Sequence, residues 1–240
     1  MKFNDEGYII NIKKHGESSA ILTVLTRDNG KVVGFVKNGL TRKNLGVYQL
    51  GNLVAIEAYS RVDENMLSLK VELVSPTAVN FLNDPAKLET LASFCGLCNI
   101  CMPEQMALER LFYYADSFFN LILEDNWITH YAYFEFYLLD FLGISLDLSE
   151  CSATGTTENL VYVSPKTGKA VCAEAGEPYK NRLFSFPQFI LEQNYEPTPQ
   201  ELRDLLEMTA FFLNKNFFQT HGLKFPPNRA NLLHNLGLNR

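Results

Sequence analysis

The sequence predicts an α+β protein in which a small β-barrel precedes a helical domain. Residues 1–80 contain short runs rich in β-branched and aromatic residues, separated by turn signals. After Pro76, apolar residues instead recur at helical spacing. A third segment, 151–187, holds glycines and prolines around one short strand pattern. We therefore expect a barrel domain in 1–80 and a helical domain in 81–240, with a small β-turn insert at 151–187.

Five strands are expected in the first domain. Their patterns cover residues 7–12, 19–26, 31–36, 51–59 and 66–74. Asp28-Asn29-Gly30 is a tight-turn signal between the second and third runs. Five short strands fit a barrel of the OB type. An SH3-like barrel fits almost as well, and periodicity does not separate the two.

Capping signals place the helices of the second domain. The expected helix starts are Pro85 after an Asp84 cap, the region of Pro103-Glu104, the region of Trp127, Pro199 within a Thr198–Glu201 capping box, and Pro226-Pro227. The third helix should end before Gly143 and the fourth near Phe218. Leu160–Val163 is the strand candidate of the insert.

Charge is unevenly distributed along the chain. The whole sequence has a formal net charge of −6, but residues 1–80 sum to +2 and residues 81–240 to −8. Residues 13–43 alone carry a local charge of +5. Such asymmetry indicates a basic binding module joined to an acidic body. The competing interpretation is a set of solvated lysines that protect strand edges from aggregation.

Composition favours a globular protein over a membrane or secreted one. A hydrophobic fraction of 47% is typical of a globular chain. We expect no transmembrane helix, because no apolar run approaches about 18 residues, and no signal peptide follows Met1. Five cysteines do not form a disulfide framework, which favours the cytoplasm.

The sequence contains no recognisable catalytic site. There is no phosphate-binding loop and no G-x-G-x-x-G run. None of the four histidines has a catalytic spacing to a cysteine, serine or carboxylate: His15, His130, His221 and His234. We expect no catalytic residues, and an enzyme is the least favoured interpretation.

Two groups of cysteines are candidate metal ligands. Cys95, Cys98 and Cys101 share one face of a helical pattern, where packing in the core is the favoured interpretation. Cys151 and Cys172 lie about twenty residues apart in the insert. Two ligands do not form a structural zinc site, so we expect no metal and no other cofactor.

Aromatic residues are more often core than binding residues. Most of the eighteen phenylalanines fall in the helical part and indicate a packed interior. In the barrel, Tyr8, Phe35 and Tyr48 could stack on nucleobases or fill the interior. For each of the three, filling the interior is the favoured interpretation.

Several segments together resemble the RecO family of bacterial recombination mediators and DNA repair proteins. They are residues 7–10, 15–18, 25–31, 37–43, 50–54, 133–143, 146–151 and 164–172. The order and spacing of these segments carry the resemblance, which covers nearly the whole chain. The chain has fewer arginines at 37–43 than the family usually shows.

The resemblance implies an N-terminal OB barrel, a helical domain and a zinc-finger-like insert. It implies a non-enzymatic protein that binds single- and double-stranded DNA and anneals complementary strands. The implied partners are RecR and the C-terminal tail of single-stranded-DNA-binding protein. RecA is an indirect partner, because the family helps to load it with RecR. No membrane partner is implied, and the expected location is the cytoplasm, at the nucleoid.

In many family members, the positions of Cys151 and Cys172 each begin a C-x2-C pair that binds zinc. This chain has Thr154 and Ala175 at the second position of each pair. It therefore resembles the zinc-free branch, and we expect no bound zinc.

The leading hypothesis is a DNA-binding mediator that uses the barrel's cations as phosphate contacts. The predicted contacts are Lys13, Lys14, Arg27, Lys31, Lys37, Arg42 and Lys43. Two alternatives remain open: an adaptor of the repair machinery that docks proteins and binds DNA weakly, and an OB-fold RNA-binding protein.

Overall fold

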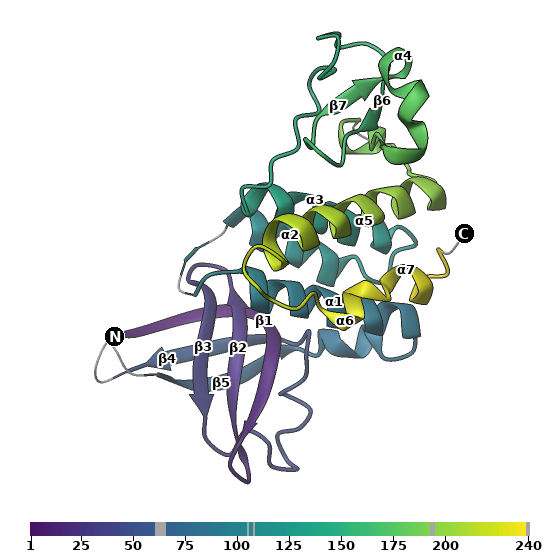
Figure 1. Cartoon of the computed structure of the whole chain (residues 1–240). Coiled ribbons are helices and arrows are strands. Elements are labelled where there is room, and N and C mark those ends of the chain that lie inside the picture. The colour runs from purple at the N-terminus through teal and green to yellow at the C-terminus, as the bar shows by residue number, and fades with distance from the viewer. Residues whose placement is uncertain (61–65, 105, 108, 193–194, 239–240) are drawn as a thin grey trace. The chain divides into compact units, whose positions relative to one another are not determined.

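The computed structural model describes residues 1–60, 66–104, 106–107, 109–192 and 195–238. Its N-terminal part is a closed, OB-like barrel of five strands in the order β1-β2-β3-β5-β4 (Figure 1). The strands are β1 (Lys2–His15), β2 (Ser19–Thr26), β3 (Gly30–Val36), β4 (Leu53–Tyr59) and β5 (Leu67–Ser75). The predicted α+β fold class is thus confirmed.

Strand β1 is longer than the predicted 7–12 because it pairs with two strands. Residues 2–8 pair with β4, and residues 7–15 pair with β2 across a bulge between Ile9 and Asn11. A parallel contact of β3 with β5, Gly34 with Leu67 and Phe35 with Ser68, closes the barrel. A bulge bends a strand, which allows β1 to follow the barrel wall.

Alternate residues of each strand fill the barrel interior. The buried interior cluster consists of Ile9, Leu22, Val24, Val32, Val36, Val54, Ile56, Ala58, Leu67 and Leu69. Because side chains alternate across a strand, the residues between them face outward. Only the outward-facing residues of the strands are therefore accessible from the surface of the barrel.

The chain divides into two compact units. The first comprises residues 1–127 and 226–232, and the second comprises residues 128–225 with the segment from Leu233 onward. The predicted division at residue 80 marks the change from strands to helices. It falls inside the first unit, which extends to Trp127.

Among its described residues, the first unit adds four helical elements to the barrel. They are the 3-10 helix η1 (Thr77–Phe81), α1 (Pro85–Cys101), α2 (Glu109–Asn120) and α6 (Pro227–Ala230). The Asp84 carboxylate accepts from the backbone nitrogens of Ala86 at 2.8 Å and Lys87 at 3.3 Å, so the predicted cap is confirmed. Phe94 stacks on Phe118 with ring centroids 5.0 Å apart in the aromatic core.

The second helix begins later than predicted. We expected its start near Pro103-Glu104, but α2 begins at Glu109. The backbone of Glu104 instead forms an isolated parallel β-bridge with the backbone of Lys31 in β3. Gln105 and Leu108, which belong to the expected helix, lie outside the described residues.

The second unit is built on two long helices. Helix α3 (Trp127–Phe141) stops before Gly143, which has a φ of +72° as expected of a C-terminal glycine. Helix α5 (Pro199–Leu213) opens with the predicted capping box. A π-helical turn, η4 (Asn214–Phe218), continues it to the predicted end, and the short α7 (Leu232–Asn235) follows.

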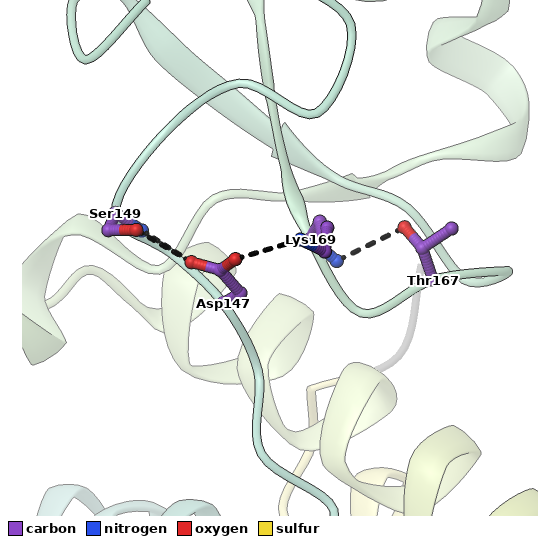
Figure 2. A network of polar contacts seen from close by, with 4 residues as sticks. All are labelled: Asp147, Ser149, Thr167 and Lys169. Atoms are coloured by element: carbon purple, nitrogen blue, oxygen red, sulfur yellow. Dashed lines mark hydrogen bonds and ion pairs between the residues drawn. The ribbon is translucent and has the colours of Figure 1, made fainter. Parts of the chain in front are cut away.

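The insert is a small three-stranded sheet in the order β7-β6-β8. Its elements are β6 (Leu160–Val163), β7 (Ala170–Cys172), α4 (Ala173–Gly176), η2 (Glu177–Arg182) and β8 (Phe184–Ser185), and the 3-10 helix η3 (Gln188–Ile190) follows it. The segment that leads into the insert is tied to its first hairpin by an ion pair from Lys169 to Asp147 at 3.1 Å (Figure 2). The hydroxyl of Ser149 donates to the same carboxylate at 2.6 Å.

Candidate nucleic-acid interface

Two connections of the barrel meet at one of its ends. The backbone nitrogen of Leu40, in the β3–β4 connection, donates to the carbonyl of Ser18 in the β1–β2 hairpin at 2.8 Å. The Ser18 hydroxyl donates to Asn38 Oδ1 at 3.0 Å, and the Asn38 nitrogen donates to Ser19 Oγ at 3.2 Å. These bonds hold the hairpin and the connection together at the end where β1 stops and β2 starts (Figure 1).

Five of the seven predicted DNA contacts lie here, on a surface that we call the basic end. All five are exposed, and none forms an ion pair with a described residue: Lys13, Lys14, Lys37, Arg42 and Lys43. The hairpin and the β3–β4 connection contribute a single carboxylate, Glu17. Clustered cations without carboxylate partners produce a positive potential that attracts phosphate groups.

The connection that carries Arg42 and Lys43 is ordered by its own hydrogen bonds. Asn44 donates from its backbone nitrogen to Thr41 O at 2.8 Å. Buried Asn52 donates from Nδ2 to two carbonyls of the connection, both at 2.9 Å. A preordered loop loses less conformational freedom when it binds a ligand.

Lys31 does not belong to the basic end, although the sequence predicted it as a phosphate contact. Its side chain is buried and donates from Nζ to the carbonyl of Asn99, in the last turn of α1, at 2.9 Å. Burial lowers the pKa of Lys31, and the nearby Glu104 opposes that shift. The buried ammonium serves the packing of α1 on the barrel, so we leave Lys31 out of the proposed interface.

Arg27 is exposed but lies away from the basic end. The basic end is where β2 starts, and Arg27 follows the last residue of β2, at the opposite end of that strand. Its guanidinium carbon is 5.8 Å from the ring centroid of Phe112. It borders a cavity of about 480 Å³ that is also lined by Asp28, Glu109 and Asp116. These carboxylates oppose the approach of phosphate, so Arg27 is also left out of the proposed interface.

The three aromatic candidates of the barrel have different surroundings. Tyr8 is fully buried, stacks on Phe119 with centroids 4.0 Å apart and donates to Asp116 Oδ1 at 2.8 Å. Tyr48 is half-buried and packs against the barrel interior. Phe35 is half-buried on the outer face of β3, one residue before the strand ends. Of the three, Phe35 is the one placed to meet a base.

Two further rings, those of His15 and Tyr59, also lie on the outer face of the barrel, although neither residue was among the predicted contacts. The His15 ring stands nearly perpendicular to that of Phe35, with centroids 5.7 Å apart. Tyr59 is 42% exposed at the end of β4. The apolar residues at 54, 56 and 58 are buried, so the alternation rule could have placed Tyr59 outward.

The clustered cysteines of α1 pack in the core, as expected. Cys95, Cys98 and Cys101 are all buried. Burial raises the pKa of Cys95 and of Cys98, which keeps both thiols neutral. Among the described residues, no group of three or more histidine, cysteine, aspartate or glutamate side chains is arranged to hold a metal ion.

The second cysteine pair does not fit zinc. The backbone nitrogen of Cys172 donates to Cys151 Sγ at 3.2 Å, and Thr154 Oγ1 lies 3.6 Å from Cys172 Sγ. Ala175 packs against the same cluster. Burial raises the pKa of Cys151, but hydrogen bonds from Thr154 and backbone nitrogens outweigh it and bring the pKa to about 6. Two sulfurs, a hydroxyl and a methyl group do not supply the four ligands of a structural zinc site.

Comparisons with known proteins give one consistent family. The family model described as "Recombination protein O N terminal" matches residues 1–77, and "Recombination protein O C terminal" matches residues 82–222. Proteins named DNA repair protein RecO from Wolbachia pipientis wMel and Mesorhizobium japonicum are each 36% identical to this chain. The first covers 97% of this chain and 99% of its own length, and the second 97% and 92%. A third, from Bartonella bacilliformis, is 34% identical over 97% of this chain and 96% of its own.

Proposed function

This chain belongs to the RecO family of DNA repair proteins, and we propose that it binds DNA through the basic end of its barrel. Family membership gives the chain a role in DNA repair and recombination. Within the described residues, no helix is both long and apolar enough to cross a membrane. The proposal assigns a surface to the DNA and a physical reason for binding.

The observation that supports the proposal is the clustering of five exposed cations around two bonded connections. Their positive charge is opposed there by one carboxylate, Glu17. Each cation that meets a phosphate releases a condensed counterion, which favours binding without reading the base sequence. The expected binding is therefore largely independent of base sequence and sensitive to salt.

We further propose that the protein anneals complementary single strands. Two DNA strands repel each other through their phosphates, and neutralisation by Lys37, Arg42 and their neighbours reduces that repulsion. In this proposal, the chain helps to load the RecA recombinase, with RecR, onto DNA coated by single-stranded-DNA-binding protein, whose C-terminal tail docks on it. The action is one of binding without a catalytic step, and it takes place at the nucleoid.

A matched pair of triple variants tests the assignment of the surface. One variant replaces Lys37, Arg42 and Lys43 of the basic end by alanine. The control replaces three exposed cations of the insert, Lys166, Lys180 and Arg182, by alanine and changes the net charge equally. Affinity for labelled single strands is measured by fluorescence anisotropy across a salt series.

The basic-end variant should bind all sequences more weakly, with a salt slope smaller by about one unit per lost contact. The insert variant should bind like the wild type. Equal losses in both variants would show that net charge, and not this surface, governs binding.

Strand annealing is tested separately by fluorescence of complementary strands, with and without single-stranded-DNA-binding protein. If the protein binds the tail of that protein but accelerates no annealing, the docking-adaptor alternative replaces the annealing proposal. Competition between single-stranded DNA and RNA of equal length separates the RNA-binding alternative.

A further inference from the structure

One residue from every strand pairing lies on a single line around the barrel. The pairings place Lys13 opposite Ile21, Ile21 opposite Phe35, Phe35 opposite Ser68, Ser68 opposite Tyr59 and Tyr59 opposite Lys2. We call this line, Lys13-Ile21-Phe35-Ser68-Tyr59-Lys2, the cross-strand row. It runs perpendicular to the strands and starts at the basic end.

All members of the row face away from the barrel interior. Their chain neighbours pack in the interior: Val36, Ala58 and both neighbours of Ser68 are buried, and Ile12 and Phe3, beside the two lysines, are half-buried against the interior cluster. Residues that alternate with interior residues point outward. The row therefore starts on β1 at Lys13, crosses the outer faces of β2, β3, β5 and β4, and returns to β1 at Lys2.

The centre of the row carries two aromatic rings on either side of a small residue. Tyr59 is 42% exposed and Phe35 is half-buried. Since neighbouring strands lie about 4.8 Å apart, the backbones that carry these rings are roughly 10 Å apart. Ser68, which lies between them, is half-buried and has a short side chain.

Cations stand at both ends of the row. Lys13 and its neighbours at the basic end occupy one side. Lys2 occupies the other side, where Glu57 lies between two lysines, 2.8 Å from Lys2 Nζ and 3.1 Å from Lys70 Nζ. These three groups carry a net charge of +1, so the row is positive at each end.

Beyond the adjacent stripe of Asn4, Glu57 and Lys70, a second stripe along the same strands is acidic. Four residues further along β1, Glu6 pairs with Ala55, and Ala55 pairs with Glu72. Both carboxylates line a cavity of about 450 Å³ in the barrel wall. A polyanion is repelled from this stripe, which leaves the cross-strand row as its path over the sheet.

We propose that the cross-strand row is the track for one DNA strand, with unpaired bases stacked on Phe35 and Tyr59. This inference rests on the proposed DNA-binding function and adds a selection for single-stranded over duplex DNA. Aromatic stacking requires an exposed base face, which a paired and stacked duplex does not offer. The lysines hold the phosphates of either form, whereas the two rings favour the single strand.

The test compares Tyr59→Ala with Tyr113→Ala, because Tyr113 is a tyrosine with 63% exposure on α2 and lies outside the row. Each variant, and Phe35→Leu, is titrated against an oligothymidylate of about 16 nucleotides, the upper end of the site size for one such barrel. The same variants are titrated against a duplex of equal length. Tyr59→Phe keeps the ring, and thermal unfolding confirms that each variant is folded.

Tyr59→Ala should weaken single-strand binding by about 10-fold and leave duplex binding within about 2-fold. Phe35→Leu should act in the same direction, and Tyr59→Phe and Tyr113→Ala should bind like the wild type. The inference is overturned if Tyr59→Ala loses no more than Tyr113→Ala, or if single-strand and duplex binding fall equally. If the ring substitutions have no effect but the wild type still binds DNA, the inference fails and the proposed function is retained. If the wild type binds no DNA, the inference and the proposed function are both wrong.

Discussion

At the scale of the residue, Lys31 shows how a cation can serve the fold instead of a ligand. Its Nζ donates to the carbonyl of Asn99 at 2.9 Å, where the last turn of α1 leaves carbonyl groups without helical partners. A cation at that position also complements the negative end of the helix dipole. Lys31→Met should therefore lower the free energy of unfolding by about 1–2 kcal/mol, as measured by urea denaturation.

Lys37→Met is the matched control for this change, because Lys37 is exposed and has no described partner. It should leave stability within about 0.5 kcal/mol of the wild type while weakening DNA binding. Lys31→Met should show the opposite pattern. A loss of DNA binding by folded Lys31→Met would return Lys31 to the interface.

Glu135 is a second residue whose role is set by burial. Its carboxylate is fully buried and accepts from the hydroxyls of Tyr131 and Thr209, the latter at 2.6 Å, which joins α3 to α5. Removing the carboxylate takes an acceptor from two buried hydroxyl groups, which costs part of their hydrogen-bond energy. Glu135→Ala should lower the free energy of unfolding by about 2–4 kcal/mol, and Glu135→Gln by less. Equal stability of the two variants in urea denaturation would contradict this role.

Sequence alone could not separate Lys31 from Lys37. Both lie in the same basic stretch, and they differ because Lys31 is buried and donates to a carbonyl of α1, whereas Lys37 follows the last residue of β3 and is exposed. Tyr8 and Phe35 differ in the same way, because Tyr8 is fully buried against Phe119 of α2 and Phe35 is only half-buried. Strand alternation predicts inward and outward positions, but it does not predict which outward positions a later segment will cover.

At the scale of the element, strands and capped helices were predicted well because their signals are local. The boundaries of β2 and β6 are those expected from β-branched runs, and the caps at Asp84 and Thr198 form as their spacing indicated. The start of α2 was wrong because the backbone of Glu104 pairs with β3, a contact between residues more than seventy positions apart. Non-local pairing leaves no local signal in the sequence.

In the insert, two substitutions should create a zinc site. Thr154 Oγ1 already lies 3.6 Å from Cys172 Sγ, and Ala175 packs against Cys151 and Cys172. The double substitution Thr154→Cys and Ala175→Cys would complete two C-x2-C pairs around one point. A tetrahedral site of four thiolates binds zinc tightly and adds to folding stability.

We expect the wild type to purify without stoichiometric zinc and the double variant to hold about one zinc per chain. Inductively coupled plasma mass spectrometry gives the metal content, and cobalt substitution reports the geometry. Each single substitution should bind less zinc than the pair. One zinc per wild-type chain would contradict the expectation that this is a zinc-free member of the family.

At the scale of the whole molecule, the net charge of −6 is a poor guide to the ligand. The five cations of the basic end face one carboxylate, while Glu6 and Glu72 lie on a separate stripe of the same barrel. The charge is therefore segregated within the barrel as well as between the N-terminal and C-terminal parts of the sequence. The local potential of a surface, rather than the sum over the chain, determines where a polyanion binds.

This segregation gives a quantitative prediction for the salt dependence of binding. If the five cations of the basic end each contact one phosphate, the slope of log K against log salt should be about −3.5 for single strands and about −4.5 for duplex DNA. Anisotropy titrations between 50 and 200 mM KCl measure both slopes, and Lys31→Met should reproduce the wild-type values. An acidic protein whose net charge governed binding would bind weakly and gain affinity as salt screens its repulsion. A slope near zero, or of positive sign, would contradict the basic end as the site of phosphate contact.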